Sequence, residues 1–340
     1  MRAARLHGIG DLRVEDIPTP GEPAEGWVRC RVTAAGICGS DLHNFRTGQW
    51  ISRSPSVPGH ELAGIVTAIG AGVSGLAEGD AVVADSRFFC GACPACIAGR
   101  HNLCATLGFV GEVCDGGFAE EVVLPARLLH KVDPGLDPAI AATAEPLAVA
   151  LHAVHRLGCG PGDPVLIAGC GPIGGLVALL LRDMGAGRIL IADRNHHRLA
   201  SVADAAAAEP VSLDGDASAL PPVRHAVEAT GSVHLLPNLI DRVDAGARIA
   251  LVGIFHGRLD LDPNLIVERE LSLEGCSVFA DELPEAIAML PRLAPAIRRM
   301  IDTEIAIEDL PEAYRRLLAG EAKGLKTIVR PHLPRAGGDA

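Results

Sequence analysis

The chain has 340 residues, of which 49% are hydrophobic, so it is long enough for two domains of ordinary size with a sizeable buried core. Acidic residues outnumber basic ones 42 to 30, which gives a formal net charge of -12. This balance, without a run of Lys or Arg, argues against a nucleic-acid partner.

Membrane and secretory classes are also disfavoured. The uncharged stretch 164–181 is as long as a membrane span, but its glycines and Pro172 predict a buried strand, a turn and a helix instead. Residues 1–10 contain no apolar signal segment. We therefore expect a cytoplasmic protein, in which the ten cysteines serve as metal ligands or buried thiols rather than disulfides.

The first part of the chain, up to about Glu145, is predicted to be mainly β. Its short alternating or apolar runs are separated by Gly and Pro, a pattern typical of strands joined by loops. The clearest runs cover 26–35, 62–69 and 117–124.

From Asp163 onward, apolar strand candidates alternate with helical segments. This alternation predicts a parallel sheet with right-handed crossovers. Strands are expected at 165–168, 188–193, 226–229, 248–254 and 271–278, and helices at 173–184, which Gly185 ends, and 235–243. A last strand, 326–330, is expected to rejoin the first part. The nucleotide domain, 147–278, is therefore predicted to be inserted in a second domain, 1–146 and 279–340.

A glycine-rich turn follows the strand at 165–168 and opens the next helix, which is the setting that a dinucleotide fingerprint requires. Small residues there let the backbone approach a pyrophosphate, whose charge meets the unpaired N–H groups of the helix N-terminus. The turn consists of Gly169, Cys170, Gly171, Pro172, Ile173 and Gly174.

Asp193 ends the second strand of this unit, nineteen residues past the turn. Its carboxylate is placed to accept hydrogen bonds from an adenosine ribose and to repel a 2′-phosphate, so NAD is predicted in preference to NADP. Arg194 could instead meet a phosphate, and Arg198, one helical turn further, could flank the ribose. Solvated surface positions are the alternative for both arginines.

Four cysteines have the spacing C-x2-C-x2-C-x7-C in a segment rich in Gly and Ala. Four thiolates can close a tetrahedral zinc site with no open coordination position, so this site is predicted to be structural and to pin a lobe at about 88–106. The cysteines are Cys90, Cys93, Cys96 and Cys104.

A second candidate set is scattered along the chain: Cys38 in the stretch 36–43, then His60 beside Glu61, and later Glu145. Each member has an ordinary structural interpretation when taken alone. A lone cysteine is usually a small core residue, a lone histidine is often a satisfied polar group, and a glutamate favours the first turn of a helix.

The order of these motifs resembles the zinc-containing medium-chain dehydrogenases, which include alcohol, sorbitol, L-idonate, butanediol and threonine dehydrogenases. The resemblance covers nearly the whole chain, down to Gly324-Leu-Lys-Thr327. It implies an α/β fold in which a doubly wound Rossmann sheet is inserted in a mainly β, GroES-like catalytic domain. It also implies one catalytic and one structural zinc ion per chain, a nicotinamide cofactor, and a homodimer or homotetramer.

For the catalytic zinc, the resemblance implies that Cys38 and His60 are ligands. Glu61 and Glu145 compete for the remaining ligand position on the zinc ion, one binding directly and the other through water. Asp41 would hold His60 in the right tautomer.

The resemblance also assigns a proton path and two basic residues. Ser40 would take the hydroxyl proton and pass it through the nicotinamide ribose to His43, which releases it to solvent; a turn residue and a surface side chain are the alternatives. Lys326 resembles the residue that steadies the pyrophosphate, and Arg269 matches an arginine that reaches polyol substrates.

The stretch 145–152 is similar to that of L-idonate and sorbitol dehydrogenases, so the expected substrate is a secondary alcohol of a polyol, sugar alcohol or sugar acid. Asn44 and Phe45 stand where sorbitol dehydrogenases carry a tyrosine, which argues against sorbitol itself. Phe45, Trp50 and Phe109 could line a more apolar pocket or be ordinary packing residues. The alternatives are a vicinal-diol, amino-alcohol or cyclitol dehydrogenase and, from another class, a nucleotide-sensing protein with structural zinc alone.

Overall fold

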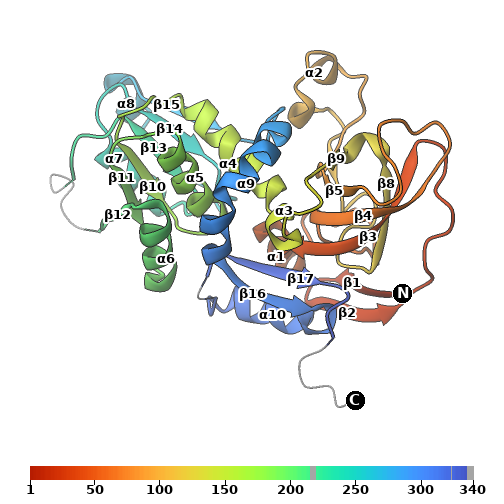
Figure 1. The fold of residues 1–340 in the computed structure, drawn as a ribbon. Helices are drawn as coiled ribbons and strands as arrows, with labels where there is room; N and C mark the ends of the chain where they lie inside the picture. The colour runs from red at the N-terminus through yellow and green to blue at the C-terminus, as the bar shows by residue number, and fades with distance from the viewer. Residues whose placement is uncertain (215–219, 323, 335–340) are drawn as a thin grey trace.

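The computed structural model describes residues 1–214, 220–322 and 324–334, and it has an α/β half and a β-rich half (Figure 1). A six-stranded sheet forms the centre of the first half and a seven-stranded sheet the centre of the second. Helices α4 (Ala144–Leu157) and α9 (Leu283–Met300) lie between the two sheets. No helix in the described ranges is long and apolar enough to cross a membrane.

All neighbouring strands of the six-stranded sheet are parallel. From β10 at the centre the chain first moves to one edge of the sheet and then to the other, so the predicted doubly wound arrangement is confirmed, with its switch point between β10 and β13. In spatial order the strands are β12 (Glu209–Pro210), β11 (Ile189–Ala192), β10 (Val165–Ala168), β13 (His225–Glu228), β14 (Arg248–Leu251) and β15 (Ser272–Gly275).

Strands β10 and β11 are buried along their whole length, as expected for apolar strands with helices on both faces. Their side chains alternate between two cores, because successive residues of a strand point to opposite faces. Ile167 and Ile191 join the core formed with α4, α5 and α9, whereas Leu166 and Leu190 join the core formed with α7. The remaining helices of this half are α5 (Pro172–Asp183), α6 (His196–Ala206), α7 (Leu235–Arg242) and α8 (Asn264–Glu268).

The β-rich half contains both the first and the last described strands of the chain, because β17 pairs antiparallel with β3. The last strand therefore rejoins the first part, as predicted. The sheet order is β16 (Ile301–Ala306), β17 (Lys326–Arg330), β3 (Trp27–Gly36), β4 (Glu61–Ile69), β5 (Ala81–Ala84) and β9 (Leu129–Lys131), with β8 (Glu121–Pro125) also paired to β3. This half also contains two short strand pairs, β1 (Arg2–Gly8) with β2 (Asp11–Asp16) and β6 (Arg87–Phe88) with β7 (Gly108–Phe109). Its helices are α1 (Gly39–Thr47), α2 (Pro94–Ile97), α3 (Pro138–Ala141) and α10 (Leu310–Leu318).

Four predicted strands are shorter than expected. The strand expected over 188–193 covers Ile189–Ala192, and the other three lose three or more residues at one end. The strand expected over 117–124 begins at Glu121, because the N–H groups of 117 and 118 donate to the carbonyl oxygens of 59 and 58. Strand β14 ends at Leu251, because the next two N–H groups both donate to the Glu228 carbonyl oxygen and turn the chain out of the sheet. The strand expected over 271–278 ends at Gly275, after which the chain crosses to the other half.

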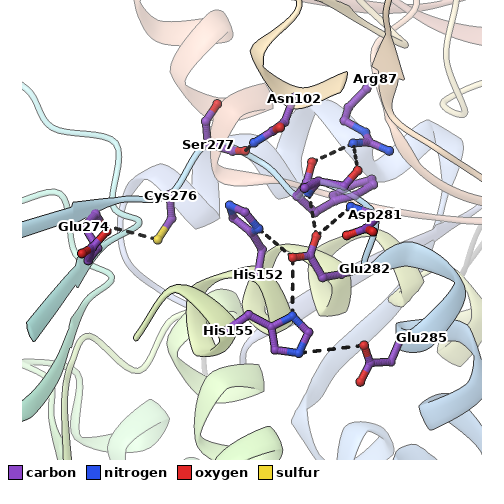
Figure 2. Close-up of polar contacts among 12 residues, drawn as sticks. Arg87, Asn102, His152, His155, Glu274, Cys276, Ser277, Asp281, Glu282 and Glu285 are labelled. Atoms are coloured by element: carbon purple, nitrogen blue, oxygen red, sulfur yellow. Dashed lines mark hydrogen bonds and ion pairs between the residues drawn. The ribbon is translucent and has the colours of Figure 1, made fainter. Parts of the chain in front are cut away.

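The segment that follows β15 is anchored to both halves before α9 begins (Figure 2). Arg87 donates to the carbonyl oxygen of Phe279 at 2.7 Å, and its guanidinium lies 4.0 Å from the centre of that ring. Asn102, from the cysteine-rich lobe, donates to a backbone carbonyl of the segment at 3.0 Å. On the other side, His152 of α4 donates from Nδ1 to Glu282 at 2.8 Å. These contacts fix where the chain passes between the halves.

Candidate active site

Cys38, His60 and Glu61 converge beside helix α1. Cys38 precedes the first residue of α1, and Glu61 begins β4 directly opposite Gly36 of β3. This register brings the end of β3 and the start of β4 together, so one donor atom from each of the three side chains lies within 4.8 Å of the other two. Thiolate, imidazole and carboxylate are the donors that zinc takes in proteins. The three residues therefore fit the catalytic zinc that the resemblance implies.

Asp41 supports two members of this set. Its Oδ2 accepts a hydrogen bond from the backbone N–H of Cys38 at 2.8 Å, and its Oδ1 lies 3.7 Å from Nδ1 of His60. A carboxylate on the Nδ1 side of an imidazole leaves Nε2 as the nitrogen that can bind a metal. This is the placement expected for Asp41.

Lys326 is buried against the same set, and this differs from its expected role. Its Nζ donates to both carboxylate oxygens of Glu61 at 2.7 Å and to the carbonyl oxygen of Ile37 at 3.1 Å. An ammonium group has three donors, and all three are used here. Lys326 therefore binds Glu61 in this structure rather than standing free to meet a pyrophosphate.

The space for the Glu61 carboxylate depends on Gly36. A Cβ atom at that position would lie 2.1 Å from Oε2 of Glu61. A glycine at this point of β3 is therefore required by the carboxylate opposite it, although the backbone there is extended. No sequence pattern indicates this requirement, because it depends on the register of two strands.

Glu145, the competing carboxylate, lies outside the group of mutually close donors. It is on the first turn of α4, is buried, and accepts a hydrogen bond from Oγ of Ser86 at 2.6 Å. Burial raises the pKa of Glu145 to about 7, against the opposing charges of His60 and Lys326. Ser86 was not found by sequence, because an isolated serine between strands carries no motif.

A cleft of about 320 Å³ joins this site to the glycine-rich turn. Its β-rich wall includes Cys38, Ser40, His43 and Glu61, as the sequence predicts for a shared site. The opposite wall is formed by the start of α5 and by the residues after β13 and β14, and it consists of Gly171, Pro172, Ile173, Ala229, Thr230, Val252, Gly253, Ile254 and His256. His256 was not predicted, because the sequence around it matches no motif.

A larger cleft of about 930 Å³ continues from the glycine-rich turn over the carboxyl ends of β10 and β11. Gly169 has a φ of +103°, and a Cβ on Gly174 would lie 1.8 Å from the Gly169 carbonyl oxygen, so both positions require glycine. Asp193 accepts hydrogen bonds from the backbone N–H groups of Cys170 at 2.6 Å and Asn195 at 2.7 Å. This cradle fits the phosphates and ribose of a dinucleotide.

Both predicted arginines line that larger cleft. Arg194 is exposed, whereas Nε of Arg198 is buried and has no hydrogen-bond partner among the described residues. Arg198 therefore has an unused donor beside the position expected for the ribose.

The structure also brings the four cysteines of the predicted structural zinc site together. The sulfur atoms of Cys90, Cys93, Cys96 and Cys104 all lie within 4.8 Å of one another. Backbone N–H groups donate to the sulfurs, for example from Cys90 to Cys104 at 3.3 Å and from Thr106 to Cys104 at 3.4 Å. These donors lower the pKa of Cys104 to about 6, which favours the thiolate that binds zinc.

The residues proposed to contact substrate are not brought to the smaller cleft. Phe45 packs edge-on against Tyr314, with ring centres 5.4 Å apart, and Trp50 packs on His43 at 4.3 Å. Phe109 lies in the two-residue strand β7. Arg269 donates to the carbonyl oxygens of Ile240 and Val243 at the end of α7. In this position the Arg269 guanidinium caps α7 and does not line the smaller cleft, and its substrate role stays a prediction.

Comparison with known proteins identifies both halves of the chain. The model of the alcohol dehydrogenase GroES-like domain matches residues 24–134, and that of the zinc-binding dehydrogenases matches 172–292. These matches confirm the expected fold, a Rossmann-type unit with a GroES-like domain.

Individual relatives are similar over almost their whole length. L-idonate 5-dehydrogenase from Vitis vinifera is 31% identical over 94% of this chain and 92% of that protein. A zinc-binding dehydrogenase from Sinorhizobium meliloti 1021, solved bound to NADP, has a TM-score of 0.91 at 31% identity, over 97% of this chain and 99% of that one. The 2R,3R-butanediol dehydrogenase structure from Bacillus subtilis has a TM-score of 0.89 at 30% identity, over 97% and 99%.

Proposed function

Because the chain belongs to the zinc-dependent alcohol dehydrogenase family, we propose that it oxidises a secondary alcohol of a polyol, sugar alcohol or sugar acid to the ketone, with NAD. The observation that carries this proposal is the convergence of Cys38, His60 and Glu61, two of which, Cys38 and Glu61, line a cleft whose other wall begins at the glycine-rich turn. A metal site and a dinucleotide cradle that share a cleft are what hydride transfer from an alcohol requires.

We propose Cys38, His60 and Glu61 as the three protein ligands of the catalytic zinc. Support comes from the 4.8 Å limit on their donor atoms and from the hydrogen bond that ties Glu145 to Ser86 instead. A bound zinc ion supplies a Lewis acid, which favours loss of the hydroxyl proton of an alcohol. Ser40, on the same wall, would accept that proton, and His43 would hold it further along the cleft.

NAD is proposed in preference to NADP because of Asp193. Its carboxylate is at the end of β11, in the larger cleft, and two backbone N–H groups hold its orientation. A fixed negative charge there repels a 2′-phosphate and accepts hydrogen bonds from a free ribose. The NADP-bound relative and the free Nε of Arg198 make NADP the alternative to test.

The substrate class rests on the likeness to L-idonate 5-dehydrogenase and on the hydroxyl groups of Ser40 and Thr230, whose residues line the cleft among apolar ones. A vicinal diol is the second candidate, because the butanediol dehydrogenase structure matches the whole fold at a similar identity.

A substrate panel tests the proposal. Purified zinc-replete protein is assayed for NAD reduction with polyols, sugar acids, 2,3-butanediol and L-threonine, and the Cys38→Ser and His60→Ala variants are assayed in parallel. We expect the highest kcat/KM for a polyol or sugar acid and no turnover in either variant. Turnover that survives in both variants, or no oxidation of any secondary alcohol, would contradict the proposed function.

We also propose that the chain forms a homodimer or homotetramer. Within the part of the chain that the structure describes, the edge strand β15 pairs only with β14, so its other edge can pair with a second chain. Light scattering on purified protein tests this, and a monomer at assay concentrations would contradict it.

A further inference from the structure

The side chain of His43 is more constrained by its surroundings than that of a solvent-exposed proton carrier. The residue is buried on α1, with a relative exposure of 4%. Its ring contacts two aromatic neighbours: Trp50, tilted at a centroid distance of 4.3 Å, and His256 from the opposite wall of the cleft, stacked at 4.8 Å with an interplanar angle of 19°. The hydrogen bonds of its two ring nitrogens decide what the residue can do.

Thr47 fixes which nitrogen carries the proton. Its hydroxyl donates to the carbonyl oxygen of His43 at 2.9 Å and accepts from the backbone N–H of Gln49 at 3.2 Å. A threonine hydroxyl has one proton and two lone pairs, so one lone pair remains. That lone pair faces Nε2 of His43 at 3.2 Å. With the hydroxyl proton given to the carbonyl oxygen, Nε2 is assigned as the donor in this contact.

Gln49 also favours an N–H group at Nε2 of His43. Its Oε1 lies 2.9 Å from Nε2 of His43, which suits an N–H donor. The reverse amide orientation would require a bare Nε2, and a bare Nε2 would then meet the Thr47 oxygen lone pair to lone pair. Thr47 therefore decides the orientation of the Gln49 amide as well as the tautomer of the ring.

The other nitrogen is left for a ligand. Nδ1 of His43 is buried and has no hydrogen-bond partner among the described residues, and His43 lines the cleft that contains Cys38 and Ser40. A buried imidazole nitrogen without a partner is costly unless a bound group meets it. In the Nε2–H tautomer this nitrogen is a bare acceptor, on a residue that lines the cleft.

We propose that Thr47 and Gln49 are positioning residues that hold His43 in its Nε2–H tautomer, so that Nδ1 is the atom that takes up the proton released by the alcohol. This inference rests on the proposed function only for the source of that proton. During oxidation the ring gains one proton at Nδ1 and becomes an imidazolium that keeps both hydrogen bonds at Nε2. It returns to the neutral form when the Nδ1 proton passes to water or buffer.

The charged neighbours of the ring are basic. Arg46, one turn along α1, is 3.1 Å from Nε2 of His256, and both residues line the same cleft. Burial, followed by the charges of His43 and Arg46, lowers the pKa of His256. Glu61 and Lys326, also in the cleft lining, are paired with each other.

The tautomer can be measured without turnover. Protein labelled with ¹⁵N-histidine is studied by NMR without cofactor, above the pH at which the ring titrates, and His43 is assigned by its loss in His43→Gln. We expect an imine-type shift for Nδ1 and a pyrrole-type shift for Nε2. In Thr47→Val with Gln49→Leu, both shifts should move toward the averaged values of a tautomer mixture, and Thr47→Ser should retain the original pair. An Nδ1–H tautomer in the original protein, or no change in the double variant, would overturn the proposal.

Kinetics separate positioning from general damage. The double variant should lose about tenfold in kcat, a part of the usual general-base contribution, with KM for NAD unchanged and with partial rescue by imidazole buffer. The same two substitutions should have no further effect in His43→Gln. An equal loss in that background would show a purely structural role. If the protein oxidises no alcohol, the proposed function fails, while the NMR result still decides the tautomer.

Discussion

Substitution of Gly36 by alanine is the sharpest perturbation of the proposed metal site. The new Cβ would lie 2.1 Å from Oε2 of Glu61 and 3.3 Å from its Cβ and Cδ. Carbon atoms in ordinary contact are roughly 3.5 Å or more from their neighbours, so the carboxylate must retreat by more than about 1 Å. That retreat breaks the 2.7 Å contacts with Lys326 and removes an oxygen from the set with Cys38 and His60.

The expected cost falls on metal binding more than on folding. Displacing one ligand by about 1 Å should weaken zinc at the Cys38 site by about 10- to 100-fold, on the order of 1.4–2.8 kcal/mol. The four-cysteine site lies elsewhere in the chain and should keep its ion. Turnover should fall with the occupancy of the catalytic site.

Chelator competition followed by metal analysis measures both sites in one sample, with the four-cysteine site as an internal reference. Gly39→Ala is the matched control, because Gly39 lies nearby at the start of α1 and a Cβ there meets no atom within 4 Å. We expect Gly36→Ala to lose one zinc ion at a chelator concentration where Gly39→Ala retains two. Equal zinc retention in the two variants would refute the argument that Glu61 is a ligand placed by Gly36.

Three further predictions concern other parts of the chain. Asp193→Gly should lower the ratio of NAD to NADP efficiency by about tenfold, the equivalent of one lost charged hydrogen bond, and an unchanged ratio in steady-state kinetics would contradict the ribose assignment. The pKa of Glu282 is lowered to about 2, with His152 the main favourable partner, so this pair stabilises the fold above the ordinary glutamate pKa and the contribution is lost as pH falls toward 2. Denaturant unfolding between pH 6 and pH 3, roughly the range of that titration, should therefore show a smaller loss of stability in His152→Gln than in the original protein. Cys104→Ser should release one zinc ion and lower the Tm while the Cys38 site keeps its ion, and metal analysis that finds both ions would contradict the four-thiolate site.

The nucleotide-binding half could be predicted closely from sequence because its signals are local. Fully apolar strands such as 165–168 and a glycine-rich turn specify their own backbone, and burial on both faces agrees with their composition. The four-cysteine lobe was equally local. In both cases the residues that determine the structure are adjacent in sequence.

Contacts between distant strands could not be predicted in the same way. Lys326 binds Glu61, 265 residues away, because β17 and β4 both flank β3. Whether Phe45 lines the cleft or packs in the core depends on a similar contact: on α1 its ring lies against Tyr314. Arg269 has no local pattern that indicates its role as a cap for α7. Side-chain direction within a correctly predicted helix decides these assignments.

The most direct test is a crystal structure of the zinc-replete protein with NAD, with anomalous diffraction measured at the zinc absorption edge. Two peaks per chain are predicted: one among the four cysteine sulfurs, and one bound by Cys38, His60 and Glu61 that faces the nicotinamide ring. A single peak at the cysteines, or a second zinc ion far from the nicotinamide, would contradict the proposed chemistry.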